Sequence, residues 1–76
     1  MAKSATRQLG ICLANEGYEV SLERWKIYFM LCDATAEKHG LVRIIDESHE
    51  DYLYPKAMFQ TVELPQRVRR AMLAAA

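Results

Sequence analysis

Residues 41–55, LVRIIDESHEDYLYP, constrain the fold of this chain more than any other stretch. In LVRIID the apolar residues alternate with a two-residue period, which puts Val42 and Ile44 on one face of a strand. DYLYP has the aromatic content of a second strand and ends at Pro55, which cannot donate a hydrogen bond to a ladder. Two short strands separated by a polar segment predict an antiparallel β-hairpin.

The segment between these strands holds four carboxylates, those of Asp46, Glu47, Glu50 and Asp51, around His49. A metal site needs ligands from several directions, whereas these come from one short loop without the glycine-centred spacing of a calcium loop. An acid–base pair needs a pocket that shifts a pKa, and a hairpin tip is exposed. We interpret the segment as a solvated turn whose Asp and Ser side chains bond the local backbone, and we expect no metal and no cofactor.

The other segments predict three more strands and two helical pieces. LGICLAN forms a strand from residue 9, and QTVEL forms the last strand. Asp33 can cap a helical turn over residues 34–38, which Gly40 can end. PQRVRRAMLAAA begins with a proline at a helix N-terminus and continues with strong helix formers, so it predicts a terminal helix.

The stretch 19–32 is long enough for a helix, but its composition favours a strand. Aromatic and β-branched residues are frequent in it. With a two-residue period, the apolar residues are expected on one face of this strand and the more polar residues on the other. The apolar residues are Trp25, Ile27, Phe29 and Leu31, and the more polar ones are Arg24, Lys26 and Tyr28.

Five short strands and a terminal helix in 76 residues predict one small domain that is mainly β. We expect a five-stranded antiparallel barrel with a short helical turn and a C-terminal α-helix, because curling one sheet onto itself hides its edges. Residues 1–8 are expected to be a polar, frayed leader, residues 9–64 the barrel and residues 65–76 the terminal helix. The order of the last strands, with a proline-led turn between them, resembles a Src-homology-3-like barrel.

Two segments resemble a family of small, uncharacterised bacterial proteins: NEGYEVSLERWKIY (15–28) and HGLVRIIDESHEDYLYPKAMFQTVELP (39–65). Together they cover about two thirds of the chain. The resemblance implies a Src-homology-3-like barrel and no catalytic residues to transfer. The family string has glycine where this chain has His49, which favours a turn position with positive φ, a geometry that His tolerates better than most residues.

The aromatic residues are the leading candidates for a binding surface. Exposed Tyr and Trp are common anchors in interfaces, and aromatic grooves on small barrels bind extended peptides. The competing interpretation is that Trp25 and one tyrosine belong to the core and that the rest are structural surface. The candidate residues are Tyr18, Trp25, Tyr28, Tyr52 and Tyr54.

Basic residues offer an alternative surface for nucleic acid. A net charge of zero argues against it, and a solvated helix face is the competing interpretation. The candidate residues are Lys26, Arg43, Arg67, Arg69 and Arg70. Cys12 and Cys32 lack the number and spacing of a zinc site or a disulfide scaffold, so both are expected to be buried thiols.

The sequence thus predicts a non-catalytic module that binds a protein partner or itself. The alternatives are a nucleic-acid-binding barrel and an enzyme or metal-dependent accessory that uses the acidic turn. No apolar run approaches the length of a membrane span, so we expect a cytoplasmic protein without a membrane partner.

Overall fold

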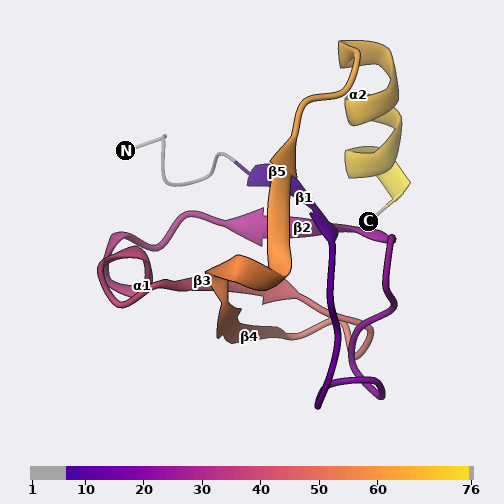
Figure 1. The fold of residues 1–76 in the computed structure, drawn as a ribbon. Coiled ribbons are helices and arrows are strands. Elements are labelled where there is room, and N and C mark those ends of the chain that lie inside the picture. Colours follow the sequence, from indigo (N-terminus) through magenta and orange to yellow (C-terminus); the bar gives the residue numbers. More distant parts are fainter. Residues whose placement is uncertain (1–6, 76) are drawn as a thin grey trace.

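The computed structural model describes residues 7–75 and contains every element type that the sequence predicts (Figure 1). A helical turn, α1, lies between the second and third strands, and a 3₁₀ turn, η2, lies between the fourth and fifth. The elements are β1 (Arg7–Cys12), β2 (Ile27–Leu31), α1 (Ala34–Lys38), β3 (Leu41–Ile45), β4 (Asp51–Pro55), η2 (Lys56–Met58), β5 (Phe59–Val62) and α2 (Gln66–Ala75). The prediction of a mainly β chain with five antiparallel strands and a C-terminal helix is therefore confirmed.

The prediction that residues 1–8 form a leader is wrong for residues 7 and 8, because β1 begins at Arg7. Arg7 pairs with Leu31 and Gln8 with Met30 in the β1–β2 ladder. Residues 1–6, on which the rest of this prediction falls, lie outside the described part of the chain, as does Ala76.

The five strands form one antiparallel sheet in the order β4-β3-β2-β1-β5, and the sheet does not close into a barrel. Closure requires β4 to pair with β5, and within residues 7–75 these strands are the two edges of the sheet. The long loop over residues 13–26 also contributes to the core. Its Leu22 is buried there, and Tyr18 from the same loop packs edge-on against Tyr54, with ring centroids 5.0 Å apart.

The strand predicted over residues 19–32 is correct only for its second half. Residues 13–26 are loop and turns, and β2 begins at Ile27. The direction of the alternation was also wrong, because Tyr28 and Met30 are buried in the core while Ile27, Phe29 and Leu31 are half-buried on the other face. A tyrosine can take the inner position because its hydroxyl has partners inside the fold.

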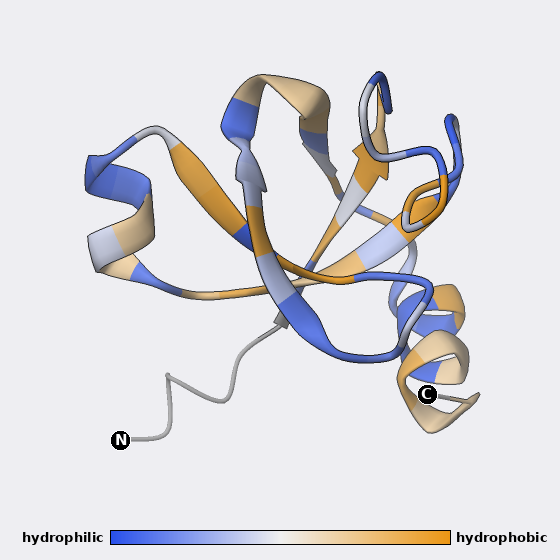
Figure 2. Ribbon diagram, turned by 90° about the horizontal axis from the view of Figure 1, so that it is seen from below, coloured by the Kyte–Doolittle hydropathy of each residue, from blue (hydrophilic) through white to orange (hydrophobic). Residues whose placement is uncertain are grey.

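The inner face of the sheet carries the hydrophobic core. Strong apolar colour marks β2 and β3 above all, and the turn between β3 and β4 is hydrophilic (Figure 2). Each of β1 to β5 contributes to the core, and so does the 13–26 loop. The core residues are Cys12, Leu22, Tyr28, Met30, Val42, Ile44, Tyr54 and Phe59, with Met58 packed against them.

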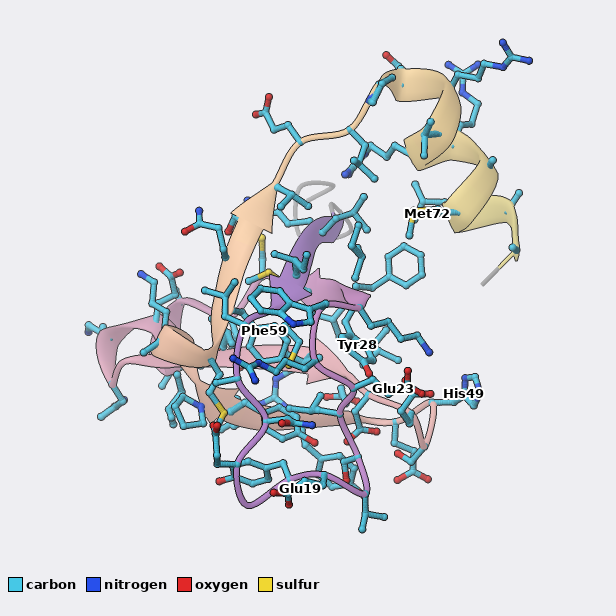
Figure 3. The ribbon with its side chains drawn as sticks, turned by 45° about the vertical axis from the view of Figure 1, so that its right-hand side comes forward. Glu19, Glu23, Tyr28, His49, Phe59 and Met72 are labelled. Carbon is cyan, nitrogen blue, oxygen red and sulfur yellow. The ribbon has the colours of Figure 1, made fainter. Side chains whose placement is uncertain are left out.

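α2 lies over part of the outer face of the sheet (Figure 1). Met72 points from the helix toward the sheet in Figure 3. Two hollows flank this contact. One, of about 260 Å³, lies between Arg69 and the β1 and β5 residues Leu9 and Val62. The other, of about 390 Å³, lies between Ala75 and the β2 and β3 strands. No side chain of α2 is buried, so the helix rests on the sheet without embedding in it.

The α1 turn follows its predicted signals. The Asp33 carboxylate accepts a hydrogen bond of 3.0 Å from the backbone N–H of Ala36, as an N-cap does. His39 ends the turn and donates from its ring to the carbonyl of Thr35 at 2.9 Å. Gly40 has a φ of 73°, the left-handed geometry expected after a helix. Of the two thiols predicted to be buried, Cys12 is buried and Cys32 is exposed.

Candidate functional site

The acidic segment over residues 46–50 is a tight turn, as predicted. Asp46 and Glu50 are joined by a backbone hydrogen bond of 3.1 Å. His49 has a φ of 70°, which confirms the expected positive-φ position, and its side chain points into solvent at the tip of the turn (Figure 3). The hydroxyl and the backbone N–H of Ser48 both donate to Asp46 Oδ1, at 2.6 and 2.8 Å. The side chains of this turn therefore organise its own backbone.

Asp46 links the turn to the aromatic residues. It is only 4% exposed, and its Oδ2 accepts a hydrogen bond of 2.5 Å from the hydroxyl of Tyr54. Burial alone would raise the pKa of Asp46, but the hydrogen bonds from Ser48 and Tyr54 outweigh it and hold that pKa below its usual value. Burial first, and then the bond to Asp46, raise the pKa of Tyr54 to about 12. At neutral pH the phenol of Tyr54 is therefore neutral, the carboxylate of Asp46 is charged, and a hydrogen bond joins them.

A groove of about 340 Å³ opens beside this pair. The tyrosines of the 13–26 loop and of β4 form its apolar walls, and Tyr18 and Tyr52 are 39% and 50% exposed. The Tyr52 hydroxyl donates to Glu50 Oε1 at 3.0 Å, which raises the pKa of Tyr52. The residues that line the groove are Tyr18, Ser21, Asp46, Ser48, Tyr52, Leu53 and Tyr54.

The structure therefore brings together three of the five aromatic candidates: Tyr18, Tyr52 and Tyr54. Tyr28 is buried on the inner face of β2, where its hydroxyl donates to Glu47 at 2.6 Å and accepts from the backbone N–H of Glu23 at 2.7 Å. Burial and the bond to Glu47 raise the pKa of Tyr28. It is a core residue with satisfied polar groups.

Trp25 lies apart from the groove and is 61% exposed. Its φ of 71° is left-handed, and its backbone N–H donates to the carbonyl of Cys12 at 2.7 Å. The guanidinium of Arg24 lies 5.1 Å from the centre of the indole ring. The interpretation of Trp25 as a core residue is therefore wrong, and it is an exposed turn residue outside the three-tyrosine groove.

The five basic candidates do not form one surface. Lys26 pairs with Glu47 at 2.6 Å, and this bond lowers the pKa of Glu47. Arg43 bridges Asp33 and Asp51, at 2.9 Å to each carboxylate.

The other three basic candidates lie on α2. Arg67 and Arg70 line its solvent-facing side together with Ala71, while Arg69 lies on the side nearer the sheet beside Val62 and Leu64. Lys26 and Arg43 therefore form ion pairs within the fold, whereas the other three candidates lie on the helix.

A metal site is not found in the described part of the chain, where no cluster of three or more His, Cys, Asp or Glu side chains has the geometry to hold an ion. The four carboxylates of residues 46–51 diverge to different partners. Asp46 bonds Tyr54, Glu47 bonds Lys26, Glu50 bonds Tyr52 and Asp51 bonds Arg43.

Sequence reasoning missed two members of the groove, Ser21 and Leu53, and it gave Asp46 and Ser48 only the role of turn residues. Ser21 comes from a loop that was predicted to be strand, so its neighbours could not be anticipated. The Asp-x-Ser spacing of residues 46 and 48 was a usable signal for the turn, because such side chains bond nearby backbone groups. That the second oxygen of Asp46 holds Tyr54 depends on the hairpin register, in which Tyr54 pairs with Val42.

Comparisons with models of known protein families, with curated proteins and with solved structures found no match to this chain. Between residues 7 and 75, neither helix has the length and apolar character needed to span a bilayer. The geometry of the site is therefore the basis for assigning a role.

Proposed function

We propose that this chain is a small, non-catalytic protein-interaction module that binds a partner protein at the groove between Tyr18, Tyr52 and Leu53. The observation that carries the proposal is the combination of exposed aromatic walls with a rigid floor. Tyr18 and Tyr52 present apolar area to solvent, while Tyr54 is locked by Asp46. A preformed aromatic surface is typical of partner recognition, because little side-chain entropy is lost on binding.

The order of the elements supports a Src-homology-3-like fold as part of this proposal. A long loop separates β1 from β2, the strands β2 to β4 follow one another as a meander, and η2 leads into β5 beside β1. The left-handed backbone at His49, where the resembling bacterial family has glycine, supports membership of that family. The proposed place of action is the cytoplasm, in keeping with an exposed, unpaired Cys32.

A capture experiment with matched variants tests the proposal. The folded chain is used as bait in a lysate of its source organism, with and without nuclease, beside Tyr52→Ala and Trp25→Ala baits. We expect a protein that survives nuclease treatment, is lost with Tyr52→Ala and is retained with Trp25→Ala, because Trp25 does not line the groove. Equal retention by both variants would contradict the assignment of the groove.

A nucleic-acid role for α2 is the second candidate, since Arg67 and Arg70 project from one side of the helix without a salt bridge in the part of the chain described. It predicts retention of RNA or DNA that falls steeply with salt and disappears with Arg67→Ala plus Arg70→Ala. Captured nucleic acid with these properties would replace the first proposal.

A further inference from the structure

We propose that the partner segment binds as a sixth strand, paired with the free edge of β4, and that this segment is extended and basic. This inference rests on the proposed function and specifies how the groove is used. It starts from the position of β4, which among residues 7–75 is an edge strand paired only with β3. Edge strands present unpaired N–H and C=O groups that another extended chain can use.

The register identifies which backbone groups are free. Hydrogen bonds join Asp46 to Glu50 and Gly40 to Lys56, on either side of the β3–β4 ladder. Hydrogen-bonded and non-bonded residue pairs alternate in an antiparallel ladder. Counting from these two bonds, the backbone N–H and C=O groups of Tyr52 and Tyr54 point toward β3. The N–H and C=O of Leu53 then point away from the sheet.

The groove follows this edge. Tyr52, Leu53 and Tyr54 are consecutive residues, and all three line it. Side chains alternate between the two faces of a strand, so no single face contains all three. What the three residues share is the backbone edge, and Leu53 is 41% exposed there. The groove therefore offers a main-chain donor and acceptor between two aromatic side chains.

The centre of the edge lacks the lysines, prolines, bulges and inward-pointing charges that protect exposed edges in natural sheets. The three central residues of β4 are uncharged, and the strand pairs with β3 without a register shift from residue 51 to residue 55. Pro55 has no N–H, so it limits the added strand to the few positions around Leu53.

Charge indicates the chemistry of the partner. Glu19 lies at the tip of the 13–26 loop in Figure 3, next in sequence to Tyr18, and its carboxylate accepts from the backbone of Gly17. Glu50 accepts from Tyr52. Neither carboxylate has a cation as a partner in residues 7–75. A strand that carries Lys or Arg would complement both, whereas the β4 edge of a second copy would bring like charges together.

The test uses linear 12-residue peptides selected by phage display on the full, folded chain. The best binder is synthesised in two forms, each N-methylated at one alternate set of residues. An added strand donates from one set only, so we expect one form to lose at least tenfold in affinity and the other to change less than threefold. We also expect the selected peptides to be enriched in Lys and Arg, and amide exchange at Leu53 to slow on binding.

Two protein variants complete the experiment. Leu53→Pro removes the outward N–H without removing a bond to β3, and Leu53→Ala keeps that N–H; only the first is expected to abolish binding of the unmodified peptide. If Leu53→Pro does not fold, the comparison of the two N-methylated peptides still tests strand addition.

Peptides that bind through Tyr52 but tolerate both methylation patterns would overturn strand addition and leave the proposed groove intact. Selected peptides that are indifferent to Tyr52→Ala would remove the groove itself, and dimerisation through β4 in sedimentation experiments would overturn the choice of a basic partner.

Discussion

The two faces of the sheet are both apolar, but they are covered in different ways. On the inner face, residues from every strand and from the 13–26 loop pack into a core in which Ile44, Leu22 and Cys12 are fully enclosed. On the outer face, Leu9 of β1 is enclosed at 1% exposed, but α2 lies over the strands without burying any of its own side chains, and Val68 and Leu73 stay exposed. The comparison indicates that the inner face contributes more to the stability of the domain than the contact with α2 does.

The largest expected effect tests this difference directly, by truncating one side chain in the inner core and one on α2. Ile44→Ala leaves a cavity in the centre of the inner face and should lower the free energy of unfolding by about 3 kcal/mol. A domain of this size has a stability of only a few kcal/mol, so this variant should unfold at a much lower urea concentration than the parent chain. The matched change Val68→Ala should cost less than about 1 kcal/mol. Urea melts followed by far-ultraviolet circular dichroism measure both, and equal losses would contradict the comparison.

A polar contact of the inner face provides the next largest effect. Asp46→Ala leaves the hydroxyl of Tyr54 and the N–H of Ser48 without their acceptor, and we expect a loss of about 2 kcal/mol. Tyr54→Phe removes the hydroxyl together with its need for a partner, so the double variant should be more stable than Asp46→Ala alone. Thermal melts of the three variants and the parent chain measure this; a double variant less stable than Asp46→Ala would show that the contact is not a coupled pair.

Gly10→Ala examines how tightly the inner face is filled. A Cβ added at this position would overlap the sulfur of Met30, so the methionine must move. Because Met30 is buried but flexible, we expect a loss of about 1 kcal/mol. Adding Met30→Leu, which lacks that sulfur, should restore part of the stability in the same urea melts. No change on Gly10→Ala would mean that the core has spare room at β1.

The smallest expected effect is a dependence on pH. The pKa values of Asp46 and Glu47 are lowered in the folded chain, so the unfolded chain takes up protons first as the pH falls. The stabilisation is complete above the unfolded values of about 4 and is lost as the pH falls through the lower folded values. The Tm should be level between pH 7 and pH 5 and should fall below about pH 4. Asp46→Asn should flatten this fall, and an unchanged slope would exclude Asp46 as a contributor.

The sequence was sufficient for the hairpin and the helical turn because their signals are local. Val42, Ile44 and Pro55 define the two strands, and Asp33 and Gly40 define the turn between β2 and β3. Positive φ at His49 was expected from the resemblance to a bacterial family that has glycine at this position, and the structure has it. Each of these features depends on residues fewer than fifteen positions apart.

The parts that could not be predicted depend on distant partners. Tyr28 can be buried only because Glu47, 19 positions away, accepts its hydroxyl, and nothing in the local alternation records that contact. Leu22 also reaches the core from a loop, and no local pattern in the sequence indicates this contact. The groove likewise joins Tyr18 to β4 across more than thirty residues, so only its members, and not their assembly, were visible in the sequence.

The position of Trp25 has a practical consequence. It is the single tryptophan of the chain, and its indole is largely in water beside Arg24. Its fluorescence should therefore change little when the domain unfolds, whereas the enclosed Tyr28 and Tyr54 rings should lose a strong near-ultraviolet dichroic signal. A flat emission curve from this protein would report the solvent around one loop residue and would say nothing about whether the core is intact.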